Sequence, residues 1–198
     1  MGLQLVSAPV MEPLRVDETK AYLRVDGTED DELIALLIQA ARRCIDGKDG
    51  SFGRALVTQT WDLFLDSFPY SYCYPSLAAD YQITIPLAPL QAVTSITYTD
   101  LNGQIQSFES TDYIVDPVTE PGRILPVFGK FWPRAQPIPN AVAVRFVAGY
   151  GTREAVPDDI KTWLKQIVAY FYEARSAALP LPTAFFGQMD RYRVAWQV

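Results

Sequence analysis

Residues 145–175 read RFVAGYGTREAVPDDIKTWLKQIVAYFYEAR, a stretch that predicts a strand, a glycine turn and a long helix. Pro157 suits the first position of a helix, and Asp158 and Asp159 follow in the first turn, where the helix dipole favours negative charge. Large apolar residues then recur at helical spacing and form one stripe: Ile160, Trp163, Leu164, Ile167, Val168, Phe171 and Tyr172. The pattern predicts a core helix against which the rest of the chain packs.

Two shorter helices are predicted upstream of this stretch. After an extended lead, Asp17 is expected to cap a helix that ends near Arg24, and Thr28 is expected to cap a second one. The apolar residues of the second helix recur every three or four positions: Leu33, Ile34, Leu37, Ile38, Ala41, Cys44 and Ile45. The acidic run 29–32 is interpreted as helix-start charge, because four consecutive acids point in different directions around a helix.

Residues 56–150 are rich in β-branched and aromatic residues, and no helical pattern interrupts them. About six strands are expected, at 58–66, 81–87, 93–99, 104–108, 112–115 and 141–148. A hairpin turn ends in Asn102-Gly103, and residues 116–140 are expected to be irregular. Consecutive strands without helices between them predict an antiparallel meander.

The predicted fold class is α+β. N-terminal helices (1–55) and the long helix (151–179) are expected to pack together, with an inserted antiparallel β region (56–150) and an extended C-terminal tail (180–198). The end of the tail alternates apolar and polar residues, and such a terminus would be adhesive if it were left free. Two outcomes are open: the tail packs on its own domain, or it docks on another protein by strand addition or burial in a groove.

The composition excludes several classes of function. The 198 residues carry a net charge of −6, which argues against a tight grip on nucleic acid. Histidine, the commonest general base and zinc ligand, does not occur. Cys44 and Cys73 lack the spacing of a metal site or a disulfide framework. No apolar run is long enough to span a membrane, and the N-terminus lacks the features of a secretory signal.

Catalytic motifs are also missing. Gly149 and Gly151 lie between a strand and a helix, but the lysine and further glycines of a phosphate loop do not accompany them. The helix dipole already explains Asp158 and Asp159. We therefore expect no catalytic, cofactor or metal site and no enzyme. The alternative is a small-ligand or carbohydrate-binding module that uses the tyrosine-rich loop 70–81 with Phe131-Trp132; an unrecognised hydrolase is the least supported hypothesis.

The order of several short motifs resembles the head–tail connector (adaptor) proteins of tailed bacteriophages and of phage-derived gene transfer agents. The resemblance covers residues ~14–194. Its segments are Val16–Asp26, Asp30–Ile34, Ala40–Arg42, Gly53–Trp61, Ile85–Leu87, Val93–Tyr98, Tyr113, Arg123, Trp132-Pro133, Val144–Phe146, Ala148–Gly151, Val156-Pro157, Tyr172–Arg175 and Tyr192-Arg193. In the Tyr-Glu-Asn-Arg box of that family, Ala174 stands here in place of Asn.

This resemblance implies a virion structural protein in the neck of a phage or phage-like particle, assembled in the bacterial cytoplasm. It implies a homo-oligomeric ring of about twelve subunits, bound to the portal and to stopper or tail proteins, with DNA passing through the channel in transient, non-specific contact. It implies a portal-docking tail, with Phe185, Phe186, Met189, Tyr192, Val194 and Trp196 as its expected contacts. It also implies that the polar side of the long helix faces the next subunit or the channel, through Lys161, Lys165, Gln166 and Glu173.

Overall fold

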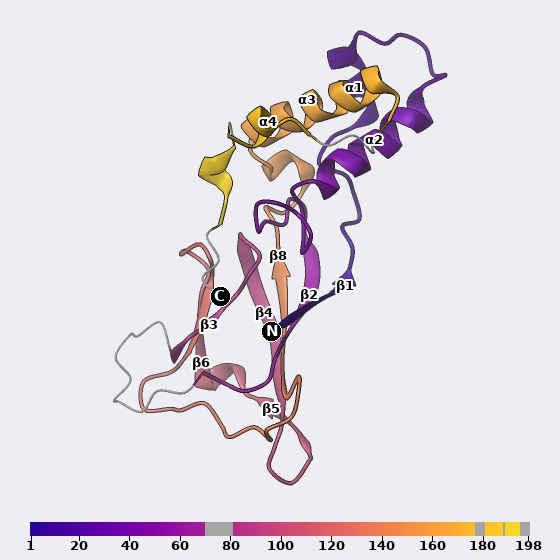
Figure 1. Ribbon diagram of the computed structural model, residues 1–198. Helices are drawn as coiled ribbons and strands as arrows, with labels where there is room; N and C mark the ends of the chain where they lie inside the picture. Colours follow the sequence, from indigo (N-terminus) through magenta and orange to yellow (C-terminus); the bar gives the residue numbers. More distant parts are fainter. Residues whose placement is uncertain (70–80, 177–180, 188, 195–198) are drawn as a thin grey trace. The chain divides into compact units, whose positions relative to one another are not determined.

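The computed structural model describes residues 1–69, 81–176, 181–187 and 189–194. They form two compact units. The β unit comprises Met1–Ala8 and Gln59–Gly149, and the helical unit comprises Pro9–Thr58 and the described part of Tyr150–Ala195. The strands lie in the first and the α-helices in the second (Figure 1). The predicted α+β class is confirmed.

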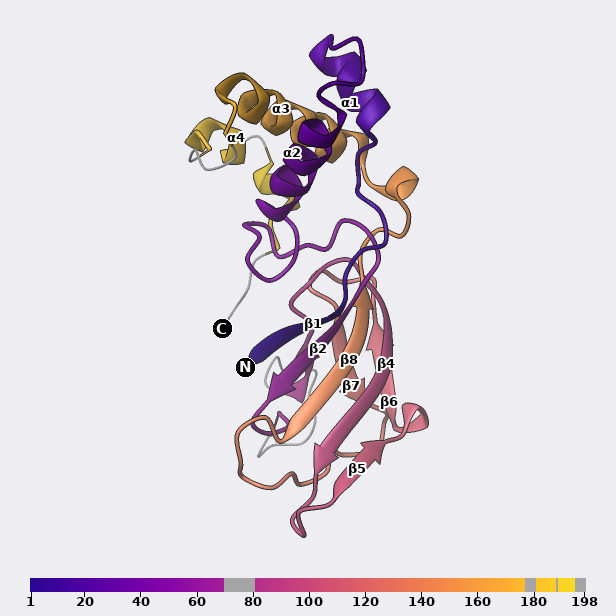
Figure 2. The same cartoon turned by 90° about the vertical axis from the view of Figure 1, so that its right-hand side faces the viewer.

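The larger sheet of the β unit has five antiparallel strands in the order β1-β2-β8-β4-β5 (Figure 2). The strands span Gly2–Ser7 (β1), Gln59–Leu65 (β2), Val142–Ala148 (β8), Leu90–Thr99 (β4) and Ile105–Phe108 (β5). Side chains alternate between the faces: Val144 and Phe146 of β8 are buried, whereas Arg145 between them is exposed. On this outer face, Arg145 donates two hydrogen bonds of 2.8 Å to the carboxylate of Asp62 on β2.

The smaller sheet has the order β3-β7-β6 and lies against one face of the larger sheet (Figures 1 and 2). Its strands span Ile83–Thr84 (β3), Arg123–Pro126 (β7) and Tyr113–Asp116 (β6), and a 3-10 turn, Ser110–Asp112, precedes β6. An aromatic cluster lies within this unit. Phe68 stacks on Trp132 with ring centroids 5.0 Å apart, and Tyr98 and Phe108 of the larger sheet pack against Phe68.

The β unit differs from the sequence prediction in four ways. The extended lead contains a paired strand, β1, so residues 1–8 join the β unit rather than the helical segment 1–55. β7 lies in the stretch expected to be irregular, and β3 is shorter than the predicted strand 81–87. The strands do not form a meander, because β8, the last in sequence, lies between β2 and β4. These features depend on pairing between distant strands, which local patterns do not encode.

The hairpin turn between β4 and β5 follows the prediction. Gly103 has φ +79° and donates its N–H to Asp100 O, and no atom lies within 4 Å of an added Cβ. Gly103→Ala is therefore expected to destabilise the β unit by about 1 kcal/mol through backbone strain alone. Gly187→Ala is the control, since it also meets no atom within 4 Å and has no positive φ. Chemical denaturation checks this prediction; equal effects of the two variants would contradict it.

The helical unit contains α1 (Val16–Leu23), α2 (Asp31–Arg43), α3 (Asp158–Ala174) and α4 (Thr183–Gly187), with 3-10 turns at Arg153–Ala155 and Asp190–Tyr192. α1 begins before the expected cap at Asp17, because the carboxylate of Glu18 accepts the N–H of Arg15 at 2.8 Å. α2 begins three residues after Thr28, with Asp30 at its N-cap. α3 begins one residue later than predicted, because Pro157 is its N-cap rather than its first helical residue.

The core of the helical unit lies between α2 and α3. Ile34, Leu37, Ile38 and Ala41 of α2 are buried together with six residues of the predicted stripe of α3: Ile160, Trp163, Leu164, Ile167, Val168 and Phe171. The seventh, Tyr172, is half-buried, and its hydroxyl donates to the carboxylate of Asp30. This hydrogen bond raises the pKa of Tyr172, because deprotonation would place two anions side by side. Within the described residues, no helix is both long and apolar enough to cross a bilayer.

Candidate functional site

The C-terminal segment, defined here as the described residues 181–187 and 189–194, packs on the helical unit. The sequence suggested an extended tail. The segment is instead folded, because it contains α4 and the 3-10 turn Asp190–Tyr192. Met189 and Val194 are only 5% and 6% exposed, respectively. The N–H of Val194 donates to the carbonyl of Phe52 at 2.9 Å. Burial of apolar side chains therefore favours a folded segment over an extended one.

Trp163 of α3 is one anchor of this segment. Its indole Nε1–H donates to the carbonyl of Phe185 at 2.7 Å. Its ring meets Phe52 edge-on with centroids 5.5 Å apart, and Phe186 packs against both rings at 6.4 Å. A buried tryptophan needs a partner for its N–H, and here the C-terminal segment supplies it.

Arg54 is the second anchor and a rare buried cation, only 6% exposed. Its Nε donates to the carbonyl of Tyr192, and its Nη1 donates to the hydroxyl of Tyr150 at 2.9 Å. The guanidinium also lies 5.9 Å from the ring centroid of Tyr150 and 5.7 Å from that of Tyr192. A buried charge requires such hydrogen bonds and aromatic faces, so Arg54 links the segment to the rest of the helical unit.

Charged side chains surround these anchors. Arg191 forms an ion pair with Asp159 of α3, whose carboxylate also accepts the hydroxyl of Tyr192 at 3.2 Å. Arg193 donates to the carbonyl of Ser51 at 2.7 Å and lies over the ring of Phe52, 5.0 Å from its centroid. These contacts are solvent-exposed, so each adds less than the buried anchors.

The predicted tail residues are only partly accessible. Phe185, Phe186 and Tyr192 are half-buried against the core of the helical unit, and Met189 and Val194 are buried in it. Trp196 lies outside the described residues. Sequence reasoning did not find the role of Arg54. The available signal was a lone arginine in the apolar run 52–57, a pattern that favours a paired, buried charge.

The polar side of α3 is divided between contacts within the chain and solvent. Lys165 forms an ion pair with Glu18 of α1 at 3.3 Å. Lys161 donates to the carbonyl of Glu154 at 3.3 Å. Gln166 is half-buried and Glu173 is exposed. The two lysines expected on a channel or subunit face therefore have partners inside the helical unit.

A second polar network holds the lead segment to α2. Arg42 pairs with Glu12 at 2.7 Å and with Asp46 at 2.6 Å, and Asp46 also accepts the N–H of Leu56 at 2.9 Å. Burial alone would lower the pKa of Arg42. The hydrogen bonds to Glu12 and Asp46, together with their negative charge, outweigh burial and raise it. Arg42 is fully engaged in this network.

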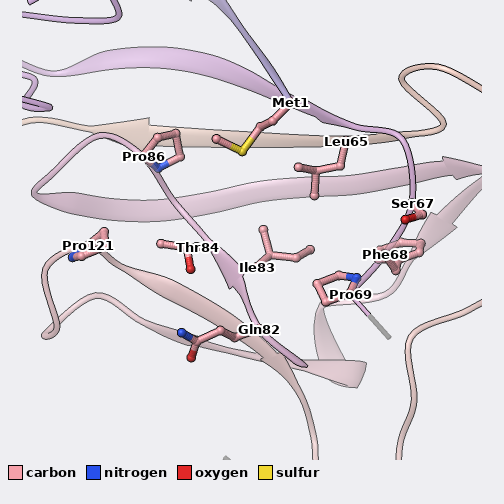
Figure 3. Close-up of a pocket in the computed structure, with 10 residues that line it drawn as sticks. All are labelled: Met1, Leu65, Ser67, Phe68, Pro69, Gln82, Ile83, Thr84, Pro86 and Pro121. Carbon is pink, nitrogen blue, oxygen red and sulfur yellow. The ribbon is translucent and has the colours of Figure 1, made fainter. Parts of the chain in front are cut away.

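The β unit contains a pocket of about 240 Å³ (Figure 3). Its lining carries no charged side chain: Met1, Leu65, Ser67, Phe68, Pro69, Gln82, Ile83, Thr84, Pro86 and Pro121. The described lining residues thus offer no acidic or basic side chain for chemistry.

Of the alternative sugar platform, the described residues include only Tyr81, Phe131 and Trp132. Trp132 is buried against Phe68, and its Nε1–H donates to the carbonyl of Tyr81. Phe131 is exposed, and loop residues 70–80 lie outside the described residues. Searching the described residues for three or more clustered histidine, cysteine or acidic groups finds no candidate metal site.

Comparison with known proteins gives a consistent assignment. A family model described as "Phage gp6-like head-tail connector protein" matches residues 14–120. No curated protein matches the chain. Among solved structures, a chain from the neck of an empty gene transfer agent (GTA) particle with C6 symmetry has 24% identity and a TM-score of 0.75, covering 100% of this chain and 98% of that one.

Two further structures give the same result. A chain from the virion of a native GTA particle has 24% identity and a TM-score of 0.74. A chain from the neck of a native GTA particle with C12 symmetry has 22% identity and a TM-score of 0.71. Both alignments cover 100% of this chain and 98% of the other. At these identities, the similarity shows the fold alone.

Proposed function

This chain belongs to the phage gp6-like head–tail connector family, and on that premise we propose that it is a ring-forming adaptor between the capsid portal and the tail of a phage or gene transfer agent. The family supports a structural connector role. A location in the neck is supported by one observation, the fold that this chain shares with chains of the neck of a GTA particle. In this proposal the protein has no catalytic role and assembles in the bacterial cytoplasm.

The ring is proposed as a closed homo-oligomer of about twelve subunits. The neck particles that contain similar chains are described with C6 and C12 symmetry, which supports a cyclic arrangement. The net charge of −6 suits a channel, because an acidic wall repels the phosphate backbone and lets DNA slide. DNA contact is then transient and independent of sequence.

The proposed partners are the portal on one side and stopper or tail proteins on the other. We assign portal docking to the C-terminal segment, because it gathers three aromatic residues, Phe185, Phe186 and Tyr192, that are only half-buried. On α3, Gln166 and Glu173 remain the proposed contacts with the next subunit or the channel. Lys161 and Lys165 belong to the same proposed face and also have partners within the helical unit.

The ring proposal predicts assembly on the portal. When the full-length chain is mixed with the portal protein proposed as its partner, electron microscopy should show an added ring with cyclic symmetry about the portal axis. The chain alone, measured by analytical ultracentrifugation, provides the control for self-association. A chain that remains monomeric in the presence of portal would overturn the proposal.

A further inference from the structure

We propose that the surface formed by Phe52, Arg54, Tyr150, Asp159 and Trp163 is a receptor site for the chain's own C-terminal segment, and that the segment must leave this site to dock on another protein. The receptor site itself is independent of the proposed function. The second part rests on that function, because it assigns the segment to the portal.

The fit between segment and receptor site is close. A small pocket lies between the segment and the receptor site. The segment lines it with Met189 and Tyr192, and the rest of the helical unit lines it with Ile45, Phe52, Arg54, Leu56, Ile160 and Trp163. With both segment side chains present, the volume that remains is about 10 Å³, room for one water molecule at most. The segment therefore fills an apolar cavity that its departure would expose.

Polar contacts specify which peptide fits this site. The carbonyls of Phe185 and Tyr192 accept hydrogen bonds from Trp163 and Arg54, respectively. Asp159 is complementary in charge to Arg191 and also binds the hydroxyl of Tyr192. A ligand for the site therefore needs an aromatic residue flanked by a cation, as in Arg191-Tyr192.

Occupancy of this site competes with docking elsewhere. Met189 and Val194 are buried in the helical unit, and Tyr192 contacts both Arg54 and Asp159. The same side chains cannot enter a second protein while they hold these positions. The apparent affinity of the segment for any partner is therefore reduced by the fraction of molecules in which it is bound in cis.

Amide hydrogen exchange of the full-length chain, measured by NMR without any partner, tests the receptor site. The amide of Val194 donates to the carbonyl of Phe52, so it should exchange at least about tenfold more slowly than an unstructured amide. Asp159→Ala removes the partner of Arg191 and Tyr192 and should accelerate this exchange about two- to fivefold. A Val194 amide that exchanges at the unstructured rate would overturn the site.

Asp158→Ala is the matched control. Asp158 stands at the same helix start and shares its dipole, but it pairs with Lys161 rather than with the segment. It should leave the Val194 exchange rate unchanged. If both variants accelerate exchange equally, the effect comes from the helix start, and the assigned role of Asp159 is wrong.

Competition is tested separately, by the rate of attachment to the portal. Asp159→Ala should attach about two- to fivefold faster than the wild type, in proportion to its greater opening. Slower or unchanged attachment, with exchange accelerated as expected, would overturn the competition and leave the receptor site standing. No attachment by any full-length chain would overturn the portal assignment instead.

Discussion

Replacing Trp163 with alanine is expected to lower the free energy of unfolding of the helical unit by about 3–5 kcal/mol. The Trp163 side chain projects from α3 and is buried against Phe52 and the C-terminal segment, so a smaller residue leaves a cavity there. It also leaves the carbonyl of Phe185 without its donor. Urea denaturation followed by far-UV circular dichroism measures the loss.

Trp163→Phe separates these two contributions. It retains an aromatic ring against Phe52 but removes the indole N–H, so it should cost roughly 1–2 kcal/mol. The Val194 amide should exchange faster in both variants, because Trp163 anchors the segment. A loss below about 1 kcal/mol for Trp163→Ala would show that the helical unit does not depend on this anchor.

The three longer helices, α1, α2 and α3, could be predicted from the sequence because their signals are local. The apolar stripe of α3 and its start after Pro157 lie within one continuous stretch. The caps of α1 and α2 were placed less accurately, since Thr28 and Asp17 compete with neighbouring acids for the same role. A cap depends on one hydrogen bond, and a stripe depends on many side chains.

The β unit shows the limit of local patterns. β1 pairs with β2, about sixty residues away in sequence. β8 pairs with both β2 and β4, which makes it central although it is last in sequence. Strand order depends on which faces bury together, and alternation within one strand cannot specify its neighbours.

The candidate site was recognised in part. The aromatic character of the C-terminal segment identified it as adhesive, and the choice between packing on its own domain and docking elsewhere was left open. The described residues pack on the helical unit because Arg54 and Trp163 supply polar partners for the backbone of the segment. Neither anchor lies near the segment in sequence, so no local motif could connect them.

Removing residues 181–198 is expected to abolish attachment to the portal. The deleted region contains all the proposed docking residues, and Tyr192 and Phe185 are the aromatic contacts among them. Attachment is measured by co-sedimentation of the chain with purified portal. Undiminished attachment of the truncated chain would show that docking uses another surface.

The truncation also removes buried side chains, so loss of attachment needs a stability control. Met189 and Val194 are buried in the helical unit, and each contributes about 1.5–3 kcal/mol by burial. Leu37→Ala on α2 is the matched variant, because it should cost about 2–5 kcal/mol while the segment stays intact. If Leu37→Ala attaches and the truncated chain does not, the segment itself makes the contact. If both fail, the folded helical unit is what the portal requires, and a synthetic peptide of residues 181–198 should then fail to compete with the full-length chain.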